Sequence, residues 1–275
     1  MSPAPAPRTA VVMAAGGLIA AVTGEPMSAE GQRVIGARPR GLRMPDVPEP
    51  EPRGGLLAPQ AVLAAARRPW KVRPIAVASS LLPRGRTPTD MIARSLHALH
   101  GDSWPDRDLR ICAVRARDAR RVVFGTSRAP VTDVGTAVAA SCAIPAYFRP
   151  VTVDGQDYVD GGVHSPSNAD VVLRDAFDLV VVLSPMTQGR GTALRPRVDT
   201  PARLAMRRFL AGEVRRLRRR GAEVVVLQPG ADDLPVMGLN PMQHSRVDDV
   251  LRSAAASTRR RLEAQPRLVE LLAGA

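Results

Sequence analysis

Residues 138–163 read VAASCAIPAYFRPVTVDGQDYVDGGV, and this stretch decides the fold. Within it, Val151–Val159 places alternating apolar and polar side chains on both sides of the dipeptide Asp154-Gly155. That pattern predicts two short strands joined by a two-residue turn. Asp160 comes next and is followed by Gly161-Gly162, which lets the backbone turn tightly and approach another segment closely. The sequence therefore predicts a hairpin that ends in a carboxylate.

Downstream of this hairpin, strands and helices alternate. The continuous apolar runs Leu179–Leu183 and Ala222–Leu227 predict strands buried on both faces of a parallel sheet. Between them, Asp199-Thr200-Pro201 begins a long helix that ends at Gly221, and an amphipathic pattern predicts one further helix over residues 245–273. This alternation predicts an α/β fold.

Upstream of the hairpin, the same reading gives one helix, two strands and a second helix. Residues 87–90, Thr-Pro-Thr-Asp, open a helix that Gly101 ends, with Thr87 as its expected cap. The runs Leu109–Val114 and Arg121–Phe124 predict strands, and the small-residue segment Val131–Ser141 predicts a helix.

The N-terminal third is less regular. The apolar run Ala10–Val22 has the length of the central part of a signal peptide, but no small-x-small cleavage pattern follows it. A buried core segment is the favoured interpretation, and the signal peptide is the alternative. Residues 38–59 are rich in proline, glycine, arginine and glutamate, which predicts an irregular surface segment.

Composition restricts the class of protein. A chain of 275 residues with 45% hydrophobic and 24% charged residues is an ordinary globular protein of one or two domains, not a collagen-like or disordered one. Cys112 and Cys142 have no zinc-site or disulfide-scaffold spacing, which favours a reducing, cytoplasmic location. His97 and His100 lie three residues apart without a third metal ligand, so no metal site is predicted.

The net charge of +13 suggests a nucleic acid or an anionic membrane as partner. Aromatic residues make up only 3%, which is poor for stacking on bases and makes nucleic acid the weaker alternative. The predicted helix from Pro201 to Arg220 is particularly rich in arginine. Its basic side chains form either a solvated face or a surface that docks on anionic lipid headgroups at the membrane periphery.

Residues 140–162 resemble the patatin-like phospholipase family, specifically its bacterial members. The family block Ala-Ser-x-Ala-Ile-Pro-x-x-Phe-x-Pro matches Ala140–Pro150, and the block Asp-Gly-x-x-Tyr-x-Asp-Gly-Gly matches Asp154–Gly162. The resemblance extends from Thr87 to the C-terminus. It implies a three-layer α/β/α domain with a mostly parallel central sheet, covering residues 1–275 with an incomplete N-terminal part.

The resemblance also implies a function, the hydrolysis of lipid acyl esters by a Ser–Asp dyad without a metal or an organic cofactor. In such a dyad the serine attacks the ester carbonyl and the aspartate takes its proton. By this resemblance Asp160 is the base, and Gly161 and Gly162 complete its motif. Ser141 and His164 are expected to line the site. The expected partner is a lipid or another acyl ester, and the oligomeric state stays open.

The sequence departs from the family at the nucleophile. It contains no G-x-S-x-G elbow, and Ala14 stands at the possible serine position. In a second register, the elbow would be encoded upstream of Met1. Ser127, in Gly-Thr-Ser-Arg-Ala, is a weak substitute. We therefore expect an N-terminally shortened, impaired hydrolase. The alternatives are a catalytically inactive member that binds lipid or a protein partner, and an arginine-rich nucleic-acid-binding protein.

Overall fold

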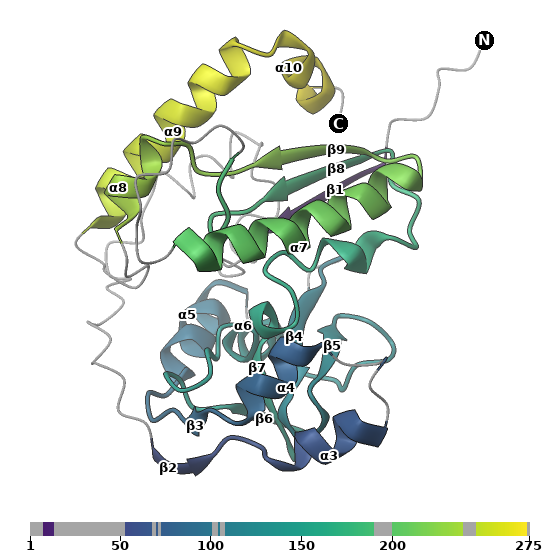
Figure 1. Cartoon of the computed structure of the whole chain (residues 1–275), viewed down its shortest axis with the longest axis vertical. Coiled ribbons are helices and arrows are strands. Elements are labelled where there is room, and N and C mark those ends of the chain that lie inside the picture. Colours follow the sequence, from purple (N-terminus) through teal and green to yellow (C-terminus); the bar gives the residue numbers. More distant parts are fainter. Residues whose placement is uncertain are drawn as a thin grey trace. The chain divides into compact units, whose positions relative to one another are not determined.

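A computed structural model describes residues 8–13, 53–67, 70, 73–100, 104, 108–189, 200–238 and 246–273. The chain divides into two compact units (Figure 1). One consists of Met1–Ala15 with Ser165–Ala275 and is called the parallel-sheet unit. The other consists of Gly16–His164 and is called the antiparallel-sheet unit. None of the helices in the described part of the chain is long and apolar enough to cross a membrane.

The described part of the parallel-sheet unit contains three strands in the order β1-β8-β9, all parallel (Figure 1). Strand β8 is central, and its Val181 pairs with Val11 of β1 on one side and Val225 of β9 on the other. The predicted buried strands are thereby confirmed. The bounds of the strands are β1 Thr9–Met13, β8 Leu179–Leu183 and β9 Glu223–Leu227.

Helices cover both faces of this parallel sheet. Val180 and Val182 are buried in one apolar cluster with Leu217 of α7, whereas Val181 faces the other way and is buried with Leu268 of α10. A strand buried on both faces needs apolar residues at every position, which explains the run Leu-Val-Val-Val-Leu. The helices of this unit are α7 Thr200–Arg219, α8 Asp233–Met237, α9 Val247–Glu263 and α10 Pro266–Ala273, with a short 3₁₀ turn at Ala169–Val172.

The antiparallel-sheet unit contains a four-stranded sheet in the order β5-β4-β7-β6. The predicted hairpin is confirmed as β6 and β7, and its turn residues Asp154 and Gly155 both have positive φ values, 47° and 65°. This is the backbone that Asp-Gly favours in two-residue hairpin turns. The strand bounds are β4 Ile111–Arg115, β5 Arg120–Phe124, β6 Val151–Val153 and β7 Gln156–Asp160.

The two faces of the antiparallel sheet carry different layers. Ala113 and Tyr158 are buried in a cluster with residues of α5 and α6, whereas Val114 and Val159 are buried in a second cluster with Leu57, α3 and α4. The second layer also contains the short antiparallel strand pair β2–β3. The bounds are β2 Arg53–Leu56, α3 Gln60–Arg67, α4 Pro74–Ser80, β3 Pro83–Arg84, α5 Asp90–His100 and α6 Val134–Ser141.

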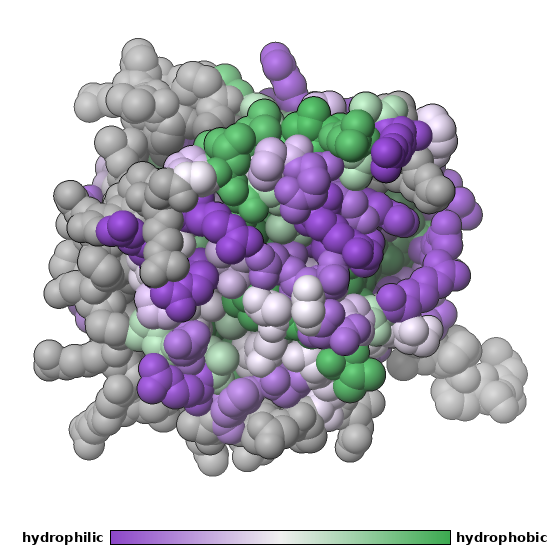
Figure 2. All heavy atoms as spheres, turned by 90° about the horizontal axis from the view of Figure 1, so that it is seen from below, coloured by the Kyte–Doolittle hydropathy of each residue, from purple (hydrophilic) through white to green (hydrophobic). Residues whose placement is uncertain are grey.

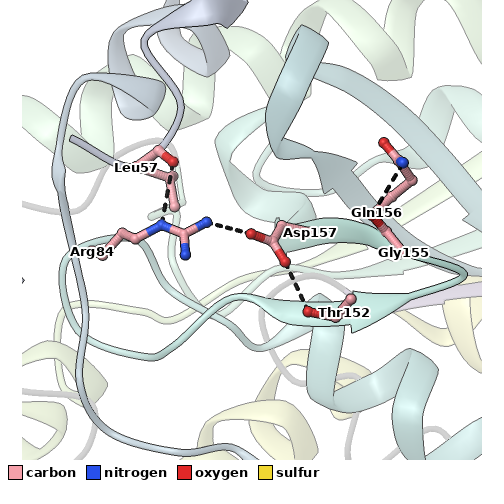
Figure 3. A network of polar contacts seen from close by, with 6 residues as sticks. All are labelled: Leu57, Arg84, Thr152, Gly155, Gln156 and Asp157. Carbon is pink, nitrogen blue, oxygen red and sulfur yellow. Dashed lines mark hydrogen bonds and ion pairs between the residues drawn. The ribbon is translucent and has the colours of Figure 1, made fainter. Parts of the chain in front are cut away.

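Arg84 joins the second layer to the β6–β7 hairpin (Figure 3). Its guanidinium forms an ion pair with Asp157, and its Nε donates a hydrogen bond of 3.5 Å to the Leu57 carbonyl. Asp157 also accepts a hydrogen bond of 2.8 Å from the Thr152 hydroxyl on the neighbouring strand. The hairpin is therefore held from the side as well as by its own ladder.

Three local predictions are corrected. Helix α5 begins at Asp90, because the Thr89 carbonyl accepts from the Ile92 N–H at 2.9 Å, and Thr87 instead forms a bridge with Phe148. The single helix expected over 245–273 is divided into α9 and α10, since Pro266 has no N–H to continue the first.

The third correction concerns the segment 38–59, which was predicted to be irregular. Residues Arg53–Leu56 form β2 and pair with β3, with a register shift between Arg53 and Leu56. Gly55 has a φ of 98°, which a side-chain-bearing residue rarely adopts, so this short strand depends on its glycine. Residues 38–52 lie outside the described part of the chain.

The predicted α/β class is confirmed. Its parallel strands are β1, β8 and β9, whereas β4 to β7 are antiparallel because tight connections join β4 to β5 and β6 to β7. Ala119, in the left-handed conformation with a φ of 53°, makes the first of these connections.

Candidate active site

Asp160 is the last residue of β7 and is fixed from three directions. It pairs with Ala113 of β4 in the sheet register. Its backbone N–H donates a hydrogen bond of 3.0 Å to the carbonyl of Ala143, just beyond the end of α6. Its side-chain Oδ1 accepts a hydrogen bond of 2.6 Å from the N–H of Gly162. The carboxylate is therefore held in one orientation at the end of the strand.

The two glycines after Asp160 allow this close arrangement. A Cβ at Gly161 would lie 2.3 Å from the carbonyl oxygen of Cys112, which no side chain tolerates because that oxygen belongs to the rigid strand β4. A Cβ at Gly162 would lie 2.9 Å from Oδ1 of Asp160. The pair Gly161-Gly162 thus lets the turn approach β4 and lets an N–H point at the carboxylate.

Desolvation by the surrounding residues raises the pKa of Asp160 to about 6, against the opposing effect of the Gly162 N–H. A carboxylate with that pKa is mostly ionised at pH 7, yet it accepts a proton more readily than an ordinary aspartate. These are the properties of a general base near its working pH.

Cys142 lies close enough to this carboxylate to respond to its charge. Burial first, and the negative charge of Asp160 second, raise the pKa of the Cys142 thiol to about 12. A thiol with this pKa stays protonated at neutral pH and is not an activated nucleophile. The position of Cys142 beside Asp160 was not predictable from the sequence, except that both lie in the matched family blocks.

Ser141 and His164 border the same turn. Ser141 is the last residue of α6, two positions before Ala143, whose carbonyl holds the Asp160 N–H. The N–H of His164 donates a hydrogen bond of 3.0 Å to the carbonyl of Gly161. Their expected role as lining residues stays a prediction.

The structure describes only one of the two positions considered for the nucleophile, Ser127 and not Ala14. Ala14 lies outside the described residues, directly after the end of β1 at Met13. Ser127 is exposed in the turns that follow β5, and α6 begins only at Val134. An elbow requires a sharp turn from a strand straight into a helix. Ser127 therefore does not occupy an elbow.

His97, considered above with His100 as a possible metal ligand, lies on α5 and contacts α6. Nε2 of His97 contacts Oδ1 of Asp133, the N-cap residue of α6, which accepts a hydrogen bond of 2.7 Å from the Thr136 N–H. Among the residues that the structure describes, no group of three or more His, Cys, Asp or Glu side chains is arranged to hold a metal ion.

One buried carboxylate in the parallel-sheet unit, that of Glu213, was not predicted from the sequence. Glu213 on α7 is 1% exposed and accepts hydrogen bonds from the hydroxyls of Ser165 (2.6 Å) and Ser167 and from the N–H of Ala169 (3.0 Å). It fixes the segment that continues the chain after the Asp160 turn. The available signal was that Glu213 is the only acidic residue between Thr200 and Arg220.

Comparison with known proteins agrees with the resemblance seen in the sequence. The family model described as Patatin-like phospholipase matches residues 61–173, a range that contains β4 to β7 and Asp160. A search of curated proteins found no match. Residues 61–173 of the chain are therefore similar to the patatin-like phospholipase family.

Proposed function

We propose that the chain is a lipid acyl hydrolase of the Ser–Asp dyad class, with Asp160 as its general base. The observation that carries the proposal is the state of this carboxyl group. It is oriented at a strand end by the Gly162 N–H, and its pKa is raised to about 6. The family match over residues 61–173 supports a lipid ester as the substrate.

In the proposed reaction, Asp160 accepts the proton of a serine hydroxyl as the serine oxygen attacks the ester carbonyl. The tetrahedral intermediate collapses to an acyl-serine, and the leaving alkoxide takes the proton from Asp160. Water then attacks the acyl-serine, with Asp160 again accepting and returning a proton. None of these proton transfers requires a metal or an organic cofactor.

The experiment that tests this proposal identifies the nucleophile directly. The protein is incubated with a fluorophosphonate, the modified residue is located by mass spectrometry, and turnover of short-chain esters is measured before and after labelling. We expect one labelled serine and loss of turnover in proportion to labelling. A protein that neither labels nor hydrolyses any ester would contradict hydrolase activity.

The second candidate is a lipid-binding member that does not hydrolyse its ligand. It is favoured by one observation, that the sequence contains no G-x-S-x-G and carries Ala14 at the possible serine position. For the same reason we propose that any hydrolysis is impaired. Binding to lipid vesicles without labelling or turnover would select this candidate.

Helix α7 provides a basic surface for either candidate. Its exposed residues include Arg208, Arg215 and Arg219, whereas Arg203 is buried and donates a hydrogen bond of 3.1 Å to the Pro185 carbonyl. The outward arginines are proposed to attract the protein to anionic headgroups at the membrane periphery.

Replacing four arginines in the last turn and a half of α7 is expected to weaken binding to anionic vesicles at low salt. The change is to glutamine at Arg215, Arg216, Arg218 and Arg219, and the expected loss is roughly 1 kcal/mol per charge near the surface. Cosedimentation at 20 mM and 500 mM salt measures it, and the difference from wild type should vanish at high salt. Equal binding to neutral and anionic vesicles at low salt would contradict this role. Salt-sensitive binding to DNA or RNA in place of vesicles would select the nucleic-acid alternative.

A further inference from the structure

Large apolar side chains gather on the outside of one short segment. Among the exposed large hydrophobic residues in the described part of the chain, seven lie between residues 56 and 82. The most exposed is Trp70 at 77%, followed by Leu63 at 58%. We call this set the apolar surface; its members are Leu56, Val62, Leu63, Trp70, Ile75, Leu81 and Leu82.

The same segment directs its small and polar residues inward. Ala61 and Ala76 are buried against the antiparallel sheet. Ser79 and Ser80 are also buried, and their hydroxyls donate to carbonyls of their own helix, to Ile75 at 2.8 Å and to Val77 at 2.6 Å. A segment that faced only water would bury its leucines and expose its serines. Here Leu57 is buried, but the other four leucines of the segment are exposed and Ser79 and Ser80 are buried, so the arrangement is largely inverted and the outer face is suited to contact with an apolar phase.

The members of the apolar surface are neighbours in the fold as well as in sequence. The N–H of Leu57 donates a hydrogen bond of 2.7 Å to the carbonyl of Leu82, which brings the start and the end of the segment together. Helix α3, with Val62 and Leu63, packs against α4, with Ile75. Figure 2 views the molecule from below, the side on which Figure 1 labels β2, β3 and α3, and shows a band of hydrophobic side chains beside hydrophilic ones.

The charged residues of this segment are all basic. Between Glu51 and Asp90 the sequence contains no acidic residue, whereas seven basic residues lie there: Arg53, Arg67, Arg68, Lys71, Arg73, Arg84 and Arg86. In the structure, Arg67 ends α3 on its exposed side, close in sequence to Leu63. Arg84 is engaged by Asp157, as described above (Figure 3). Among the described residues of the segment, Arg67 and Arg86 are exposed, so basic side chains accompany the apolar ones at the surface.

We propose that the apolar surface docks on an anionic lipid bilayer. Leucine, valine and isoleucine side chains would enter the boundary between headgroups and acyl chains, tryptophan would lie at the interface, and the arginines would contact lipid phosphates. The proposal deepens the proposed function and rests on it in one respect, that the substrate is a lipid. It assigns docking to a surface distinct from the basic helix α7.

Charge complementarity selects the bilayer over other occupants. Two copies of this surface facing one another would bring like charges together, because the sequence between Glu51 and Asp90 contains basic residues and no acidic one. A nucleic acid would match the charge but would leave the exposed leucines and isoleucine without an apolar partner. An anionic membrane satisfies both properties.

The first experiment measures binding to vesicles of phosphatidylglycerol and phosphatidylcholine in 500 mM salt. The variant combines Leu63→Gln, Trp70→Gln and Ile75→Gln, all at exposed positions. Burial of a large apolar side chain corresponds to about tenfold in affinity. Because insertion is partial, we expect the variant to bind at least about 100-fold more weakly.

A matched control removes the same kind of side chain elsewhere. Val131, Leu251 and Val269 are also exposed, at 99%, 51% and 45%, and none belongs to the apolar surface. Their combined replacement by glutamine should leave binding in 500 mM salt unchanged. The α7 arginine variant should likewise retain its binding at this salt concentration. Circular dichroism melting of all variants checks that each remains folded.

A second measurement uses the two tryptophans of the chain. Trp70 is exposed, whereas the indole N–H of Trp104 donates a hydrogen bond of 2.6 Å to the Thr132 carbonyl. Vesicles should shift the wild-type emission to the blue, and brominated lipids should quench it. Trp70→Phe should abolish both effects and leave only the unchanged emission of Trp104.

The outcomes separate this proposal from the proposed function. Loss of high-salt binding in the apolar-surface variant, with retention in both controls, supports docking even if no ester is hydrolysed. Equal binding of variant and wild type overturns the docking proposal while leaving hydrolysis of soluble esters intact. A wild-type dimer in lipid-free solution that the variant abolishes, without wild-type binding to vesicles, also overturns it and assigns the surface to a second copy.

Discussion

Replacement of Asp160 by Asn is expected to stabilise the protein at pH 8 and to remove its hydrolytic activity. The pKa of Asp160 in the folded protein is about 6, compared with 3.8 for the ordinary group. The folded state therefore binds the proton more tightly, and this contribution to stability is fully present below about pH 4. It is lost as the pH rises through about 6, because the carboxylate is then ionised in a desolvated place.

The expected gain for Asp160→Asn at pH 8 is on the order of 2 kcal/mol in the free energy of unfolding, less than the full shift because Asp160 is partly exposed. At pH 4 the two proteins should differ little. Urea denaturation at intervals between pH 4 and pH 8 measures the difference. Asp154→Asn in the hairpin turn is the matched control and should show no such gain. A stability difference that does not change with pH would contradict the raised pKa.

The same variant tests the dyad. An amide cannot accept the proton of the nucleophile, so turnover should fall about 100-fold or more. Retention of wild-type turnover would show that Asp160 is not the base. A gain in the free energy of unfolding together with a loss of turnover would show that Asp160 destabilises the folded protein and is needed for the reaction.

Glu213→Ala is expected to destabilise the protein by about 3 kcal/mol, because three donors in a buried place lose their acceptor together. These are the Ser165 and Ser167 hydroxyls and the Ala169 N–H. Glu213→Gln retains one amide oxygen as an acceptor and should cost about 1 kcal/mol. Chemical denaturation at pH 7 measures both values.

The control for Glu213 is Glu223→Gln on β9, whose side chain is 43% exposed and lies 3.6 Å from Arg267. Exposed ion pairs contribute little, so this change should fall within about 0.5 kcal/mol of wild type. If Glu213→Ala were equally mild, the three hydrogen bonds would have no role in holding the 165–169 segment.

Local patterns in the sequence predicted the elements whose signals are local. Asp154-Gly155 with its alternating flanks gave the hairpin, and Leu179–Leu183 gave the central parallel strand. Pro266 was an equally local signal for the division between α9 and α10, and the amphipathic pattern on both sides concealed it. Thr87 shows the limit of such signals, because its pairing with Phe148 depends on a segment 61 positions away that no helix-capping rule describes.

For the candidate site, the position of the carboxylate was predictable from the sequence but its environment was not. The position of Asp160 at a strand end followed from the hairpin and the two glycines. The pKa of its carboxyl group did not, since desolvation depends on what the fold packs around it. Nor did the inverted packing between Leu56 and Leu82, because leucine-rich composition predicts a core as readily as an exposed surface.

The distance along the chain between β1 and β8 has a consequence for the order of events during synthesis. The Arg8 N–H donates a hydrogen bond to Asp178 across 170 positions, and within the described residues β1 pairs with β8. The other unit, Gly16–His164, is one uninterrupted stretch. On a ribosome, this stretch is synthesised before β8, so the native pairing of β1 with β8 can form only after the whole of the other unit has been made.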